Sequence, residues 1–180
     1  MRRITWPLIA AMLLAVTIAV PASASVDRIP VSLDAYNTGV VFDWGYWWDS
    51  GNMYHARDLS IELRTDSTGV EGHEYVNGYI VFESMDRDIN CLTGKGTLRT
   101  EFTWTSDLDE DSGWIGTSIG HFSGYNCVWP PDYEWTIETN VVAHGFGQFE
   151  GLEYRAVDVK AIDDEGIPYH HSEGYVMVPG

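Results

Sequence analysis

The chain has 180 residues, 27 of them acidic and 10 of them lysine or arginine, so its formal net charge at pH 7 is −17. Such an anionic surface repels phosphate backbones and anionic lipid headgroups, which argues against nucleic acid and membrane surfaces as partners. Its six histidines and two cysteines form no metal-ligand motif, and the sequence predicts neither a metal site nor a cofactor.

The first 24 residues have the three parts of a secretory signal peptide. Arg2 and Arg3 form a basic start, residues 8–20 are apolar, and residues 22–24 read ASA, a cleavage site of small residues. The apolar run is shorter than the roughly 20 residues that span a bilayer, although a retained membrane anchor is the alternative. We predict a secreted, extracytoplasmic protein whose mature chain, residues 25–180, is one domain with a formal net charge of −19.

After the signal peptide, segments with period-two alternation of apolar and polar residues are separated by turns rich in Gly, Asp, Ser or Asn. Leu98 and Phe102, for example, share one face of their segment, and Arg99 and Glu101 share the other. No segment shows a helical period. The predicted strands are residues 36–48, 53–64, 73–84, 97–105, 114–122, 134–144, 148–162 and 167–178.

Eight antiparallel strands with short connections predict an all-β fold, a single antiparallel β-barrel, because closure removes the exposed edges of a flat sheet. Gly116 and Gly120 within one predicted strand support the barrel, since interior glycines permit the bends that closure requires. A two-sheet β-sandwich is the alternative.

Cys91 and Cys127 are expected to form a disulfide, because thiols in exported proteins oxidise. The bridge would close a loop of 37 residues. Chain-entropy bookkeeping assigns such a loop roughly 3.8 kcal/mol of stabilisation. Two free thiols are the alternative.

Two short motifs have simpler explanations than catalysis or metal binding. Residues 116–120, GTSIG, match the serine-hydrolase elbow, but their flanks continue an alternating strand around Ser118. Asp107, Asp109 and Asp111 are spaced as in a calcium loop, yet serines stand where an EF-hand has glycine and glutamate. An acidic hairpin turn is favoured there, and calcium binding stays open.

Register gives the sharpest prediction of a ligand site. The apolar residues at positions 59, 61 and 63 share a face, and alternation extends that face back to Arg57 and His55. If the face points inward, both side chains enter the barrel, where a buried arginine needs a partner. The partner is either an interior acid, such as Glu83 or Glu153, or an oxygen atom of a ligand. An internal salt bridge that plugs the barrel, and a bulge that sends Arg57 outward, are the alternatives.

Four aromatic residues lie within residues 44–48. Alternation places Trp44, Tyr46 and Trp48 on one face and Trp47 on the other, with core and barrel-end packing as the simplest interpretation. An exposed Trp47 would instead be suited to stacking on a sugar ring.

Residues 143–156, AHGFGQFEGLEYRA, have a regular glycine spacing. Gly145, Gly147, Phe149 and Gly151 resemble the G-x-G-x-F-x-G segment of barrels of the allene-oxide-cyclase or dirigent type. The resemblance implies a small secreted or organellar eight-stranded barrel whose interior holds an apolar small molecule, which some members cyclise and others guide into coupling. It assigns no catalytic residue in this chain.

We therefore expect the barrel interior to bind a small apolar or aromatic molecule. The alternatives are a cyclase or isomerase acting on a polyene, with His55, Glu83 or Glu153 moving a proton, and a carbohydrate-binding module on the Trp47 side. The sequence leaves enzymatic activity, ligand identity and oligomeric state undecided. The candidate ligand-binding residues are His55, Arg57, Trp44, Tyr46, Trp47, Trp48, Glu83 and Glu153.

Overall fold

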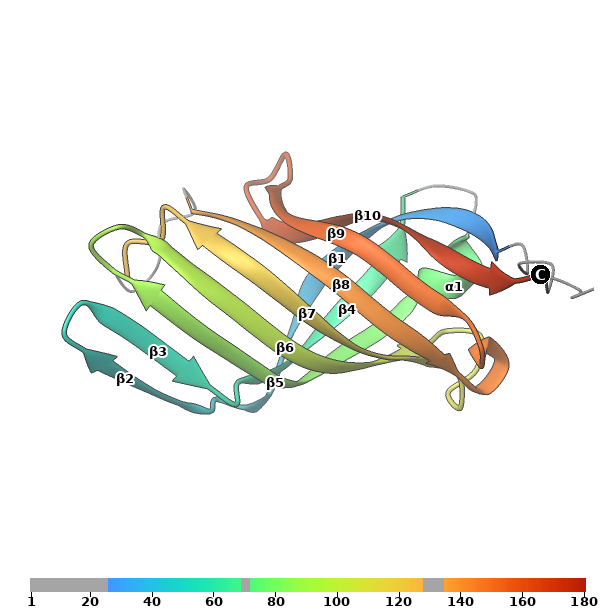
Figure 1. The fold of residues 1–180 in the computed structure, drawn as a ribbon, viewed down its shortest axis with the longest axis horizontal. Coiled ribbons are helices and arrows are strands. Elements are labelled where there is room, and N and C mark those ends of the chain that lie inside the picture. The colour runs from blue at the N-terminus through green and yellow to red at the C-terminus, as the bar shows by residue number, and fades with distance from the viewer. Residues whose placement is uncertain (1–25, 69–71, 128–134) are drawn as a thin grey trace, which may run out of the picture.

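In the computed structural model, the described residues are 26–68, 72–127 and 135–180. The predicted signal peptide, residues 1–24, lies outside them. These ranges form a ten-stranded antiparallel sheet that closes on itself (Figure 1). Within them, no helix has the length and apolar character needed to cross a bilayer.

The elements in chain order are β1 (Val26–Asp43), β2 (Tyr46–Ser50), β3 (Met53–Arg57), β4 (Ser60–Ser67), α1 (His73–Val76), β5 (Gly78–Asn90), β6 (Lys95–Ser106), β7 (Gly113–Ser123), β8 (Thr136–Phe146), the 3-10 turn η1 (Gly147–Phe149), β9 (Glu153–Ile162) and β10 (Pro168–Pro179).

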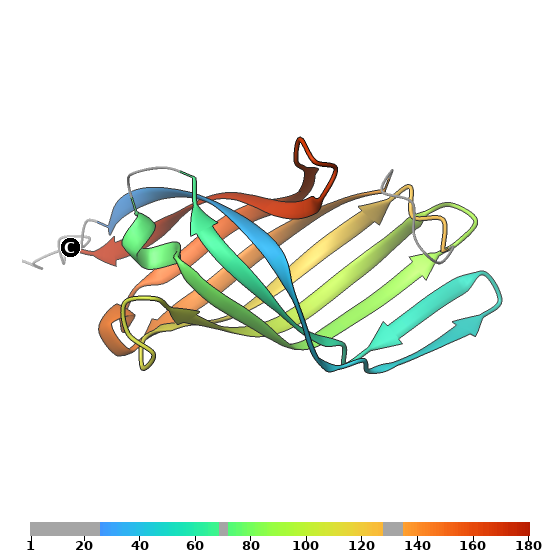
Figure 2. The same cartoon turned by 180° about the vertical axis from the view of Figure 1, so that it is seen from behind.

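Eight strands make the barrel, in the order β1, β4, β5, β6, β7, β8, β9, β10, with β10 paired to β1. The remaining two, β2 and β3, form a hairpin outside the ring. The hairpin joins the sheet along β5, because β4 pairs only with residues 78–82 of β5, whereas β3 pairs with residues 87–90. Figure 2 shows β5 to β8 extending past β1 and β4 toward this hairpin. The predicted all-β barrel of eight strands is confirmed, with two further strands.

Two of the predicted strands are each divided into two, because the chain turns sharply within them. Asp58 has a φ of 58°, a left-handed conformation that separates β3 from β4 within predicted strand 53–64. Gly45, with a φ of 60°, separates β1 from β2 within predicted strand 36–48. A side chain at Gly45 would overlap the Arg57 carbonyl, so this turn requires glycine.

Two further differences concern the ends of strands. β1 begins at Val26 rather than at residue 36, since alternating Val31, Leu33 and Ala35 are buried in the barrel. The start of predicted strand 73–84 is the short helix α1, and β5 runs on to Asn90.

A β-bulge in β5 changes which residues face the interior. Phe82 pairs with Phe102 and Ser84 pairs with Glu101, so Glu83 is the extra residue. Phe82 faces inward before the bulge, and Arg87 faces inward after it. The bulge therefore moves the inward face from even to odd positions.

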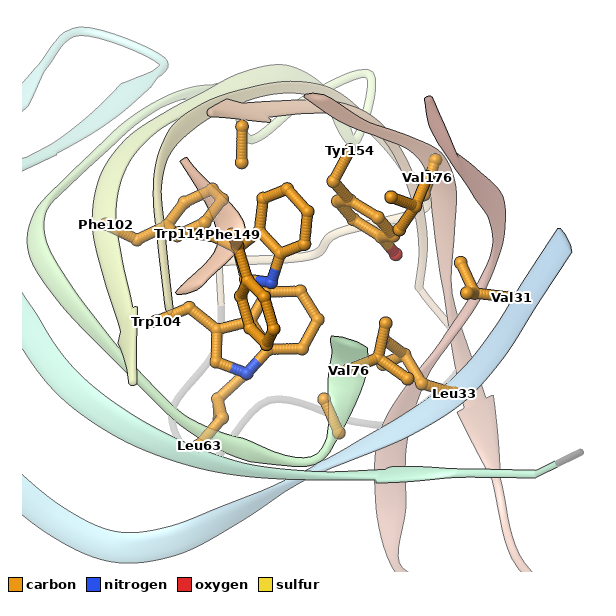
Figure 3. Packing of buried hydrophobic residues seen from close by; sticks show 13 residues of the cluster. Val31, Leu33, Leu63, Val76, Phe102, Trp104, Trp114, Phe149, Tyr154 and Val176 are labelled. Atoms are coloured by element: carbon orange, nitrogen blue, oxygen red, sulfur yellow. The ribbon is translucent and has the colours of Figure 1, made fainter. Parts of the chain in front are cut away.

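One cluster of buried apolar side chains fills the end of the barrel next to α1 (Figure 3). Trp114 stacks on Phe149 of η1 with a centroid separation of 5.4 Å, and Trp104 meets Tyr154 edge to face. The Trp114 Nε1 donates to the Tyr75 carbonyl oxygen at 2.8 Å, which ties α1 to this end. We call this the α1-end cluster.

A second cluster lies toward the opposite end, where the predicted disulfide is present. Cys91 follows β5 and Cys127 follows β7, and their Cα atoms are 5.5 Å apart. The bond therefore joins the ends of β5 and β7, two strands that are separated in the sheet by β6. We call the cluster beside it the disulfide-end cluster, formed by Met85, Ile89, Leu98, Phe122, Tyr125 and Ile137.

Candidate functional site

A cavity of about 240 Å³ lies inside the barrel, and its walls include members of both buried clusters. This volume is close to the lower end of the about 300–1,000 Å³ that ligand pockets occupy. Most of the wall is apolar, with Leu33, Ile61, Phe82, Phe102 and Ile137 contributed by five different strands. The interior is thus only partly filled by side chains.

Arg87 is in the wall of this cavity and makes no ion pair with a carboxylate of the described residues. Its Nη2 donates to Met85 Sδ at 2.8 Å, and its guanidinium carbon lies 6.0 Å from the centre of the Phe122 ring. The Nε is buried and has no hydrogen-bond partner. Burial lowers the pKa of Arg87, against smaller opposing effects of Tyr125 and Tyr54. The protein therefore holds a cation at an energetically costly position.

Other polar groups of the wall also lack partners. Trp135 Nε1 and Thr139 Oγ1 are buried without a hydrogen bond in the described part of the chain. The Tyr154 hydroxyl lies near Ser172, but it makes no hydrogen bond of normal geometry, and burial raises the pKa of Tyr154. With Arg87 Nε, these are the four unsatisfied buried side-chain atoms found in the described residues, and all belong to cavity-lining residues.

Asp158 is the carboxylate that the described residues contribute to the cavity wall, and it is already bonded. His170 Nδ1 lies 2.9 Å from its Oδ2, and Ser172 Oγ donates to its Oδ1 at 2.9 Å. Lys160, also in the wall, donates to the Trp135 carbonyl oxygen at 2.8 Å. Asp158 and His170 thus form a hydrogen-bonded carboxylate–imidazole pair in contact with the cavity.

The expectation that Arg57 and His55 enter the barrel is wrong. His55 pairs with Asp88 across β3 and β5, on the face opposite to Arg87, and its Nδ1 lies 2.5 Å from Asp88 Oδ1. Arg57 Nη2 donates to the same carboxylate at 2.7 Å, and this bond raises the pKa of Arg57. The left-handed residue Asp58 breaks the alternation on which the expectation depended.

Glu83 and Glu153 also lie outside the interior. The bulge turns Glu83 to the exposed face, where its Oε1 accepts a hydrogen bond from Thr103 Oγ1 at 2.6 Å. Glu153 pairs with Arg155 on the outer face of β9. The groups predicted to move a proton in a cyclase or isomerase, His55 included, therefore do not contact the cavity.

The aromatic residues at positions 44–48 do not pack in the core, because β2 is an edge strand outside the barrel. Trp44, Tyr46, Trp47 and Trp48 are 75%, 57%, 68% and 40% exposed. Tyr46 and Trp48 share a face as predicted, with ring centres 5.7 Å apart, and Trp48 stacks on His55 at 4.8 Å. Trp47 pairs with Ala56 and faces the other way.

The GTSIG motif and the acidic residues at positions 107–111 have structural roles. Ser118 is inside strand β7 and shares a 2.7 Å hydrogen bond with Thr100. Asp107 accepts two hydrogen bonds from Arg64, at 2.7 and 2.6 Å. Asp109 accepts hydrogen bonds from its own turn, which lower its pKa, the largest effect coming from the Asp111 backbone NH. Within the described ranges, no three His, Cys, Asp or Glu side chains are arranged to hold a metal.

Arg87 is not among the predicted ligand-binding residues, although the sequence contains a signal for it. Met85, Arg87 and Ile89 alternate with acidic residues in the stretch MDRDI, which places the arginine on an apolar face. The predicted strand ended at residue 84, before this pattern begins. Thr139 had a similar signal, because it falls between Ile137 and Val141 on the apolar face of its strand, whereas Asp158 had none, because Val157 and Val159 next to it suggest the opposite face.

The segment that resembles the allene-oxide-cyclase or dirigent barrels, residues 143–156, forms the end of β8, η1 and the start of β9. Gly147 has a φ of 62°, so the turn between these strands depends on a glycine. In comparisons with known proteins, no family model, no curated protein and no solved structure matches this chain.

Proposed function

We propose that the protein is an exported binding module that takes up one small apolar or aromatic molecule in the barrel interior. The observation that carries the proposal is the cavity of about 240 Å³ between the two buried clusters. A largely apolar cavity with a few converging polar groups is the common form of a small-molecule site. Export is supported by the signal-like N-terminus and by the Cys91–Cys127 disulfide, because such bonds persist in oxidising compartments.

The test is a titration of the purified, disulfide-bonded protein with 1-octanol, a flexible apolar probe, and with naphthalene, a rigid aromatic one. Tryptophan fluorescence reports binding, because Trp104 and Trp135 line the cavity. We expect saturable binding of at least one probe with one site per chain. Native mass spectrometry of protein purified from its own host is expected to show a retained small molecule.

A matched pair of variants locates the bound probe. Ala35 lines the cavity, whereas Ala161 lies on the outer side of β9. Ala35→Leu fills part of the space and is expected to weaken binding roughly tenfold or more. Ala161→Leu is expected to leave it unchanged. Unaltered binding by Ala35→Leu, or absence of binding of both probes to the unmodified protein, would contradict the proposal.

Carbohydrate binding by the β2–β3 hairpin is a second candidate, favoured by the exposure of Trp44 and Trp47 on an edge strand. Exposed tryptophan faces are suited to stacking on sugar rings. A soluble neutral oligosaccharide such as cellohexaose is the probe, measured by isothermal titration calorimetry. We expect binding that Trp47→Ala weakens and that Ala35→Leu leaves intact; the absence of binding would exclude this oligosaccharide class.

A further inference from the structure

We propose that the molecule held in the cavity is a monocarboxylate, with its carboxylate on Arg87 and its apolar body between the two clusters. This inference rests on the proposed function, since it names the class of ligand for the same cavity. It also assigns to Arg87 an acceptor that the described residues do not provide.

Arg87 differs from the arginines of the outer surface that are paired. Arg57 binds Asp88, Arg64 binds Asp66 and Asp107, and Arg155 binds Glu153. The chain has 27 acidic residues, so carboxylates are abundant. Arg87 faces the interior without a carboxylate partner among the described residues, which points to an acceptor supplied by a ligand.

The polar groups near Arg87 include more hydrogen-bond donors than acceptors. Arg87 Nε and Trp135 Nε1 are both buried, both without partners, and both able only to donate. Within the described part of the chain, Arg87 donates to the thioether sulfur of Met85, which is a weak acceptor. A carboxylate offers two oxygens in the spacing of the guanidinium fork, and it would satisfy these donors with charge-assisted bonds.

Strand register places a further hydroxyl in the same row of the wall. Arg87 pairs with Leu98, Leu98 with Gly120, and Gly120 with Thr139. Thr139 Oγ1 lacks a partner among the described residues, and its side chain packs against Gly120. The row thus combines the guanidinium group with an unsatisfied hydroxyl. This combination suits a polar head next to apolar walls.

Besides Arg87, the wall contains the charged residues Asp158 and Lys160, and Lys160 already donates to the Trp135 carbonyl oxygen. Asp158 lines the same cavity and is held by His170 and Ser172 rather than by Arg87. Its carboxylate would repel a second negative group on the ligand. An apolar monocarboxylate therefore fits the wall better than a dicarboxylate or a phosphate ester does.

The test compares octanoate with 1-octanol and octanamide, neutral probes of equal chain length, by isothermal titration calorimetry at about pH 8, where a carboxylate is ionised. On the unmodified protein we expect octanoate to bind roughly tenfold or more tightly than either neutral probe. Arg87→Met is expected to remove this preference and to keep octanol binding. Arg155→Met, which removes an outer-face arginine, is the matched control and is expected to keep the preference.

Each outcome distinguishes the two proposals. If octanol binds as tightly as octanoate, or if Arg87→Met keeps the preference, the monocarboxylate inference is overturned and the binding-module proposal stands. If neither neutral probe nor octanoate binds, the monocarboxylate inference is overturned, and the binding-module proposal is overturned as well if naphthalene also fails to bind. If acetate binds as tightly as octanoate, the site is one for small anions and the role of the apolar body is refuted. The comparison with octanamide needs no variant, so it remains decisive if Arg87→Met fails to fold.

Discussion

Arg57 and Arg87 are neighbours on paired strands, yet their guanidinium groups lie on opposite faces of the sheet. Arg57 Nη1 donates to the main-chain carbonyl of Arg87 at 2.9 Å, while its Nη2 binds Asp88 on the outer face. Arg87 lines the cavity on the inner face. The principle that a buried arginine needs an acceptor therefore applies to Arg87, and the outer arginine already has its partner.

This difference predicts opposite effects of the same substitution on the ligand-free protein. Arg87→Met removes an unpaired cation from the interior and is expected to raise the free energy of unfolding by about 1–2 kcal/mol. Arg57→Met takes a donor from Asp88 in a partly exposed pair and is expected to lower it by about 0.5–1 kcal/mol. Urea unfolding of both variants measures this. A lower stability for Arg87→Met would show that the unmodified protein satisfies the arginine in another way.

Two buried threonines allow a test of the unsatisfied hydroxyl. Thr139 Oγ1 has no partner, whereas Thr100 Oγ1 is bonded to Ser118 Oγ. Thr139→Val is expected to leave the free energy of unfolding unchanged or to raise it by up to about 1 kcal/mol. Thr100→Val leaves the Ser118 hydroxyl unpaired and is expected to lower it by about 1–3 kcal/mol. Equal losses in the two variants would indicate that Thr139 has a partner, such as an ordered water.

The disulfide is predicted to supply a large part of the stability. Replacing Cys91 and Cys127 with serine releases a loop of 37 residues in the unfolded chain. The expected loss is roughly 3.8 kcal/mol in the chain-entropy model, measured by guanidinium chloride unfolding. The unmodified protein kept under reducing conditions is the control and is expected to show the same loss. A change below about 1 kcal/mol would contradict the prediction.

His171 makes stability depend on pH. Its Nδ1 lies 2.7 Å from Asp34 Oδ1 and its Nε2 3.0 Å from Glu173 Oε1, and the bond to Asp34 is the main cause of its raised pKa. Because the folded protein binds this proton more tightly than the unfolded chain, the stabilisation is complete below the ordinary histidine pKa of about 6.5. It is lost as the pH rises through the folded pKa.

The expected result is that His171→Gln lowers the free energy of unfolding more at about pH 5.5 than at about pH 9. Urea unfolding at the two pH values measures the difference. His121→Gln, on the exposed face of β7, is the control and is expected to show no such dependence. An equal effect of His171→Gln at both pH values would mean that the two carboxylates do not stabilise its protonated form.

The sequence by itself determined the class of fold and the covalent link. Period-two alternation in segments such as residues 97–104 depends only on which side chains avoid water, so it predicts strands without knowledge of their partners. The count of strands and the need to close sheet edges then predicted the barrel. Because Cys91 and Cys127 are the two cysteines of the sequence, each can form an intramolecular disulfide only with the other.

Only the tertiary structure decided which residues face the cavity. The left-handed turn at Asp58 and the bulge at Glu83 each shift the register by one position, and a shift of one position exchanges the two faces of a strand. Neither Asp58 nor Glu83 is a residue type that marks such a break in the sequence. Each break depends on pairing with a strand that is distant in sequence. As a result Arg57 lies outside and Arg87 inside, a choice that the alternation pattern alone cannot make.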